Sequence, residues 1–310
     1  MIFVLRGIMV SLAFFSLLYS FLSLALLAAW RCLKFGRPGK RLAANALFTL
    51  RVMPFSVAAA VSVFLTLPSF LLFEARAMDE DLGTFVLAAC ALALGVAGLG
   101  RVLAAAEQTR RVVSACLAGA EPLASSAGAV AVVSPQTVFP MMLVGLRAPC
   151  IVISESARRL LSAAELEAAV RHETQHLRTR DNLRKAILNC LPFPGMKSLE
   201  EAWQEAAELA ADDGAVASHD EALDLAAALI KLTRHFPDRA TPRLATGLGT
   251  VNGSLTARIE RLLGWQPAPA ANSSPWCYAL PLVLVILLGL AVKVGPALAA
   301  IHALTDRLVP

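Results

Sequence analysis

Four stretches of this 310-residue sequence contain no charged residue, and they constrain its fold more than any other feature. A helix that crosses the hydrocarbon core of a bilayer needs about 20 mainly apolar residues. The first two stretches reach that length, the third is close to it and the fourth is slightly shorter. They cover residues 7–30, 52–73, 82–100 and 276–292. The pattern predicts four membrane-spanning helices, a polar domain at residues 101–275 between the third and fourth, and a short tail to Pro310.

The first stretch has a competing interpretation as a signal peptide, because Arg6 precedes its apolar core. However, it is longer than a typical signal-peptide core of about 7–15 residues. It is also followed by six basic residues and no acidic one, namely Arg31, Lys34, Arg37, Lys40, Arg41 and Arg51. Such a cluster stops translocation and marks a cytoplasmic loop, so we expect a retained helix.

The same charges predict the orientation of the chain. The loop between Arg31 and Arg51 is basic, whereas residues 74–81 contain four acidic residues and one arginine. Because loops rich in lysine and arginine face the cytoplasm, the polar domain is expected there too. The net charge of +5 arises mostly from the basic loop at the membrane surface, so it requires no nucleic-acid partner.

None of the six cysteines belongs to a C-x-x-C pair, which argues against a thiolate zinc site. They are Cys32, Cys90, Cys116, Cys150, Cys190 and Cys277. On the reducing side of the membrane, no disulfide is expected.

The polar domain is predicted to be of the α+β class. Short alternating or β-branched runs favour strands at residues 129–134, 137–146 and 150–154. An S-x-x-E capping box at Ser162 starts a helix, which must end before Pro192. A second box at Ser198 predicts an alanine-rich helix that runs toward Gly214, and further helices are expected at residues 221–234 and 254–263.

The helix capped by Ser162 carries the sequence H-E-x-x-H at residues 172–176. His172 and His176 share one helix face, so both rings can bind one metal ion. Glu173 stands beside the first histidine and can act as a general base toward the attacking water. The motif predicts a zinc metallopeptidase, the alternative being a surface helix that contains these letters by chance.

A catalytic zinc usually has three protein ligands, and spacing alone leaves the third open. Glu208 is the leading candidate, with Asp212 one turn further along to hydrogen-bond the free nitrogen of a histidine. His219 and Glu205 are alternatives. The acidic residues of this helix could also form no more than a solvated stripe.

The sequence also does not decide which group donates a hydrogen bond to the oxyanion, the substrate carbonyl oxygen that becomes negatively charged during the reaction. Both tyrosines, Tyr19 and Tyr278, fall in or beside membrane spans, so a tyrosine cannot easily serve. The remaining candidates are an arginine, His219, His235 or backbone amides.

The order of these features resembles the BlaR/MecR-type membrane metallopeptidases. The similarity is strongest over residues 162–181 and includes E-L-A-A-D-D at residues 208–213 and R-I-x-x-L at residues 258–262. The resemblance implies an α-helical membrane protein of the bacterial inner membrane, with a zincin-like domain inserted between transmembrane helices 3 and 4. It also implies a gluzincin-like site with Zn²⁺ held by His172, His176 and Glu208, and Glu173 as catalytic base.

Receptors of this type cleave a cytoplasmic transcriptional repressor after an extracellular signal. We therefore expect a regulatory protein or the cytoplasmic tail of a membrane protein as substrate, with the lipid bilayer as the other partner. The receptors carry a penicillin-binding sensor after the fourth helix, whereas this sequence ends at Pro310, so β-lactam sensing is not expected. The alternatives are an HtpX-like quality-control protease and a catalytically silent signalling scaffold.

The predicted strand at residues 137–146 is expected to bind the substrate. An extended peptide would add to this strand as a sheet edge, near Met141, Met142 and Val144. Pro140 would limit pairing between two copies of the edge. The alternative is that this strand lies inside the sheet.

Overall fold

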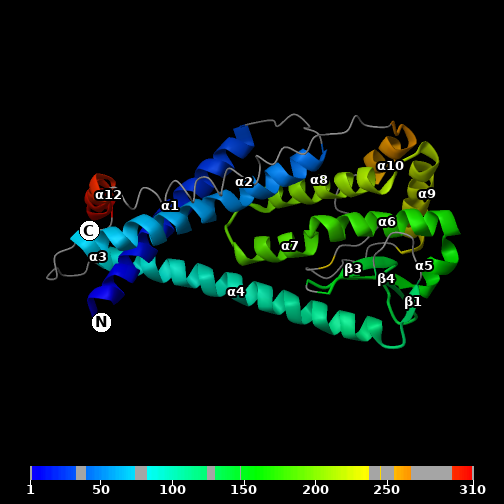
Figure 1. The fold of residues 1–310 in the computed structure, drawn as a ribbon, viewed down its shortest axis with the longest axis horizontal. Helices are drawn as coiled ribbons and strands as arrows, with labels where there is room; N and C mark the ends of the chain where they lie inside the picture. Colours follow the sequence, from blue (N-terminus) through cyan, green and yellow to red (C-terminus); the bar gives the residue numbers. More distant parts are fainter. Residues whose placement is uncertain are drawn as a thin grey trace.

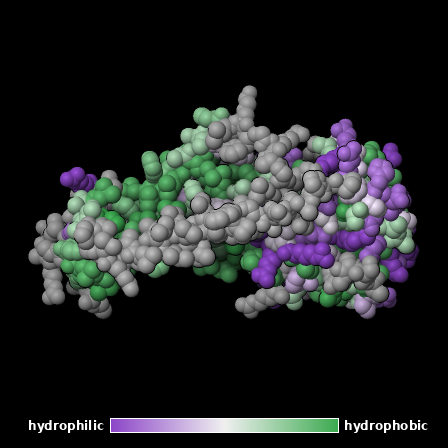
Figure 2. Space-filling view, turned by 45° about the horizontal axis from the view of Figure 1, so that its top comes forward, coloured by the Kyte–Doolittle hydropathy of each residue, from purple (hydrophilic) through white to green (hydrophobic). Residues whose placement is uncertain are grey.

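The structure, a computed structural model, describes residues 2–32, 40–73, 82–123, 130–146, 148–236, 245, 255–266 and 295–308. These residues form an elongated molecule with long helices at one end and a domain of shorter helices and a small sheet at the other (Figure 1). Hydrophobic residues predominate over the first end, and hydrophilic residues gather at the second (Figure 2). This separation is expected of a chain with one end in lipid and the other in water.

Three helical segments are long and apolar enough to cross a membrane, at Phe3–Cys32, Ala43–Phe73 and Leu82–Leu117. The first lies in α1 (Ile2–Cys32) and the third is α4 (Leu82–Leu117). The second combines α2 (Lys40–Val61), the π-helical turn η1 (Ser62–Thr66) and α3 (Leu67–Phe73). The prediction of three apolar helices before the domain is confirmed. The predicted fourth span, residues 276–292, lies outside the described residues.

Helix α4 continues past the apolar stretch that ends at Gly100 and leads directly into the domain. Its last turns carry Val112, Val113 and Cys116, which pack against the sheet. The predicted third span and the first turns of the polar domain are therefore one continuous helix.

The sheet has four strands in the order β1-β2-β4-β3. They are β1 (Glu121–Leu123), β2 (Ala131–Ser134), β3 (Met141–Val144) and β4 (Cys150–Ser154). Strands β2 and β4 are parallel, and the other neighbours are antiparallel. The strand predicted at residues 137–146 begins only after Pro140, because the Thr137 hydroxyl accepts a hydrogen bond from the Phe139 N–H and forms a local turn. Strand β1 was not predicted.

Alternate strand residues face two separate cores. One face packs against α6 (Ala163–Thr179) and α9 (His219–His235) through Met141, Leu143, Ile151 and Ile153. The other face packs against α4 through Met142, Val144 and Val152. The sheet is thus held between the helix with the H-E-x-x-H motif and the long helix that enters from the membrane.

The remaining helices are α5 (Glu155–Leu160), α7 (Asp181–Cys190), α8 (Lys197–Ala215), α10 (Leu255–Leu263) and α12 (Gly295–Leu308). The predicted capping box of α6 is present, with both hydrogen bonds between Ser162 and Glu165. The box predicted at Ser198 is wrong, because α8 begins at Lys197 with Met196 as its N-cap and no side-chain cap. Gly195, at a φ of 86°, turns the chain before Ser198, which is therefore already helical.

The turn between α7 and α8 docks among the spanning helices. A Cβ on Gly98 of α4 would clash with the Cys190 carbonyl oxygen, so this approach requires glycine. Arg51 is 1% exposed and donates to Glu200 at 2.9 Å and to the Leu191 carbonyl. The prediction that Arg51 ends a loop is wrong, because it lies inside α2, where it fastens the turn to the membrane helices.

Candidate metal centre

Helix α6 directs two histidine rings at one point. His172 and His176 are four residues apart, and their Nε2 atoms lie 3.1 Å from each other. Both side chains are buried, and so is that of Glu173 beside the first ring. Burial restricts the rotamers of all three groups, so the pair of rings is preformed.

Glu208 of α8 completes a set of three donors. Its two carboxylate oxygens lie 3.5 Å from His172 Nε2 and 3.6 Å from His176 Nε2. Ligands at about 2.0–2.1 Å from a tetrahedral zinc ion stand roughly 3.3–3.4 Å apart, close to these separations. The donor atoms lie within 4.8 Å of one another, and the described part of the chain contains no other such group. The residues present therefore fit a zinc ion.

The other candidate ligands lie elsewhere. Glu205 is exposed on the outer side of α8, although it stands only three residues before Glu208. His219 and His235 are exposed at the two ends of α9. His302 belongs to α12, at the opposite end of the molecule (Figure 1).

The second nitrogen of each ring contacts a further carboxylate. His172 Nδ1 lies 3.0 Å from Asp212, and His176 Nδ1 lies 2.7 Å from Asp181. Such contacts orient a ring and increase its basicity. Burial lowers the pKa of His172, but the hydrogen bonds with Asp212 and Glu208 outweigh it and raise the pKa to about 9. This contact of Asp181 with His176 was not predicted from the sequence. The position of Asp181 five residues after His176, within the segment of strongest resemblance, was the available signal.

Arg258 of α10 balances the negative charge. It is 7% exposed and donates to both oxygens of Asp212, at 2.6 and 2.7 Å. Its Nη1 lies 3.0 Å from Glu208. Burial raises the pKa of each of these carboxyls, but the charge of Arg258 and the interactions with the histidine rings together outweigh burial and lower both pKa values. The R-I-x-x-L motif marked Arg258 but did not show what it contacts.

The side chains predicted to meet a substrate are buried. Met141 and Met142 are 0% exposed and Val144 is 1% exposed, because they fill the two cores. Strand β3 is nevertheless an edge of the sheet within the described residues. Because these residues are buried as a whole, a peptide on this edge would have to displace groups that cover the β3 backbone, Asn182 among them.

The backbone groups of β3 alternate in direction. The Ser154 N–H donates to the Pro140 carbonyl, so in the antiparallel register the groups of Met142 and Val144 point to β4. Those of Met141 and Leu143 point away from β4, to the outer edge of the sheet.

The first turn of α7 reaches this edge. Asn182 donates to the carbonyl oxygens of Leu143 and Gly145, at 3.1 and 3.3 Å. Its neighbour Asp181 contacts His176. The start of α7 thus joins the edge strand to the pair of histidines.

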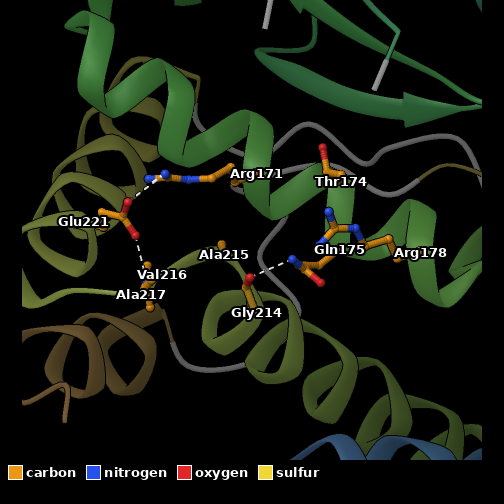
Figure 3. Close-up of a pocket in the computed structure, with 9 residues that line it drawn as sticks. All are labelled: Arg171, Thr174, Gln175, Arg178, Gly214, Ala215, Val216, Ala217 and Glu221. Atoms are coloured by element: carbon orange, nitrogen blue, oxygen red, sulfur yellow. Dashed lines mark hydrogen bonds and ion pairs between the residues drawn. The ribbon is translucent and has the colours of Figure 1, made fainter. Parts of the chain in front are cut away.

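A pocket of about 280 Å³ lies beside α6, and none of the three donors lines it (Figure 3). Here Arg171 pairs with Glu221 at 2.7 Å, and the Gln175 side chain donates to the Gly214 carbonyl at 2.6 Å. A Cβ on Gly214 would lie 2.7 Å from Gln175 Cδ. This glycine therefore sets how closely α8, with Glu208, approaches α6.

A buried set of two histidines and a carboxylate, on a domain joined to apolar spanning helices, defines a membrane-anchored peptidase of the metal-dependent class. Comparison with known families agrees, because residues 97–262 match the family described as BlaR1 peptidase M56. The match covers more than half of the chain, and the chain belongs to this family. The predicted BlaR/MecR-type relationship is confirmed, and a peptidase family implies a protein substrate. The comparison with curated proteins finds no match.

Proposed function

We propose that this protein is a zinc endopeptidase of the bacterial inner membrane, with its active site in the cytoplasm, that cleaves a regulatory protein during signalling. The observation that carries the proposal is the set of three donors at the mutual distances of zinc ligands. A carboxylate behind each histidine ring adds to this support.

Each residue of the site has a role in this proposal. His172, His176 and Glu208 would hold the ion, which when bound would polarise the scissile carbonyl and make the attacking water more acidic. Glu173 would accept a proton from that water and pass it to the leaving nitrogen. Asp212 would keep the His172 ring turned so that its Nε2 faces the ion.

The first test uses the full-length chain purified in detergent, with zinc content and casein cleavage as readouts. Glu173→Gln should retain about one zinc ion and lose roughly 10²–10⁴-fold in cleavage rate, because it removes only the proton acceptor. Retained cleavage at full zinc occupancy would refute this role. Loss of cleavage in the variant also excludes the silent scaffold.

The third ligand is tested by the same zinc measurement. Glu208→Ala should lose most of the zinc, whereas Glu205→Ala, a matched change on the exposed side of α8, should not. Equal zinc content in the two variants would contradict the assignment.

The proposed docking site is the backbone along the outer edge of β3, where a peptide would have to displace the Asn182 side chain from the Leu143 carbonyl. Since the outward groups belong to Met141 and Leu143, a docked peptide would use every second backbone N–H of its own chain. Casein-derived peptides with one N-methyl group at successive positions should therefore lose cleavage at alternate positions only. A uniform effect along the peptide would exclude docking on this edge.

A further inference from the structure

The proposed peptidase reaction needs a group that stabilises the carbonyl oxygen of the scissile bond as it gains negative charge. Arg258 and the two candidate histidines do not supply it. Arg258 already donates to Asp212 and faces Glu208, and His219 and His235 are exposed on α9.

Lys185 of α7 lies one turn beyond a residue that contacts the metal site. It follows Asp181 by four residues, so both lie on one face of the helix, and Asp181 contacts His176 at 2.7 Å. Asn182, in the same turn as Asp181, donates to the edge strand at Leu143. Lys185 thus lies one turn along α7 from the residues that contact the histidine pair and the proposed docking edge.

The amine of Lys185 already donates a hydrogen bond to a main-chain carbonyl of the protein itself. Its Nζ donates to the carbonyl oxygen of Ala245 at 2.8 Å. Ala245 is 1% exposed and packs in the same core as Met142 and Val144 of β3. A main-chain carbonyl next to the edge strand is therefore within reach of this side chain.

The surrounding charges agree with this position. Burial lowers the pKa of Lys185, and the negative charges that oppose this shift come from carboxylates of the site. In decreasing order of effect they are Glu208, Asp181 and Glu173.

We propose that Lys185 is a catalytic residue, which donates a hydrogen bond to the oxygen of the scissile carbonyl and stabilises its developing charge. The substrate carbonyl would replace that of Ala245 as the acceptor. This inference rests on the proposed peptidase function.

The test compares Lys185→Met and Lys185→Arg with wild type in the full-length protein, using a casein peptide that wild type cleaves. Removing one oxyanion donor lowers kcat by about 10²–10³-fold, so Lys185→Met should fall by this factor with KM and zinc content nearly unchanged. Lys185→Arg, which keeps the charge and a donor, should recover part of the rate.

A second readout separates catalysis from a structural role. A phosphinic analogue of the cleaved bond carries the charged oxygen, whereas the peptide itself, bound to the Glu173→Gln variant, does not. Lys185→Met should weaken binding of the analogue and leave binding of the peptide nearly unchanged. Equal losses for both ligands, or an unchanged kcat, would overturn the inference while leaving the proposed function intact. A wild type that cleaves nothing would refute the proposed function and this inference with it.

Discussion

At the scale of single residues, buried charged groups from four helices meet at the metal site, with Asp181 of α7 behind His176. His172 lies on α6, Glu208 and Asp212 on α8, and Arg258 on α10. Removing one member of a buried ion pair leaves the other uncompensated, at a cost of about 3–5 kcal/mol. Arg258 therefore acts on the metal site through Glu208 and Asp212, although it is not itself a candidate metal ligand.

We predict that Arg258→Met lowers zinc affinity about 10–100-fold, the loss typical when a group behind a metal ligand is removed. Competition with a chelator measures it. The matched control is Arg261→Met, because Arg261 donates to Asp213 and so also joins α10 to α8, away from the donors. If both variants lose zinc equally, docking of α10 matters rather than the contacts of Arg258.

The sequence could predict the donors but not their whole surroundings. Helix periodicity pairs His172 with His176 and aligns Glu208 with Asp212, because these relations are local. The contact of Arg258 with Asp212 joins residues 46 positions apart and depends on how α10 packs. No local pattern contains that information.

At the scale of elements, the same motif has two outcomes. Ser162 and Glu165 form a capping box, whereas the identical spacing at Ser198 does not. The difference lies in the preceding chain, where Gly195 brings the backbone into helical geometry earlier. An S-x-x-E match thus predicts a helix near its position but not the residue at which that helix begins.

Where α6 and α8 cross, we predict that the effect of Gly214→Ala on stability depends on whether Gln175 is present. Gly214→Ala alone should destabilise the protein by about 1–3 kcal/mol, because the new methyl group displaces Gln175. In a Gln175→Ala background the same change should be neutral or stabilising by up to about 1 kcal/mol, since alanine favours helix. Thermal unfolding in detergent measures both. Additive effects would show that the contact with Gln175 does not limit the approach of α8.

At the scale of the whole molecule, apolar length predicted the spanning helices but not how the domain meets them. The hydrogen bond between Arg51 and Glu200 joins residues 149 positions apart. The apolar cores at this junction combine Ala43 and Leu27 of the spanning helices with Trp203 and Leu199 of α8. Composition placed a polar domain after the third span, and only packing shows that α8 is built against the membrane helices.

The proposed cytoplasmic orientation predicts the labelling of two reporter cysteines in a variant without native cysteines. Ala217→Cys, exposed just before α9, should resist membrane-impermeant thiol reagents in intact cells. Asp81→Cys should react, because residues 74–81 hold a single basic residue and short loops poor in lysine and arginine lie outside. The reverse pattern would invert the topology.

Because the turn between α7 and α8 packs against the spanning helices, the polar domain cannot be separated from them without exposing apolar residues. Cutting the chain near Arg101 would uncover Trp203, Leu199 and Met196, which now lie against the first two spanning helices. A released fragment would expose this apolar surface to water and would be prone to aggregate. The first two spanning helices therefore complete the core of the domain as well as anchor it in the membrane.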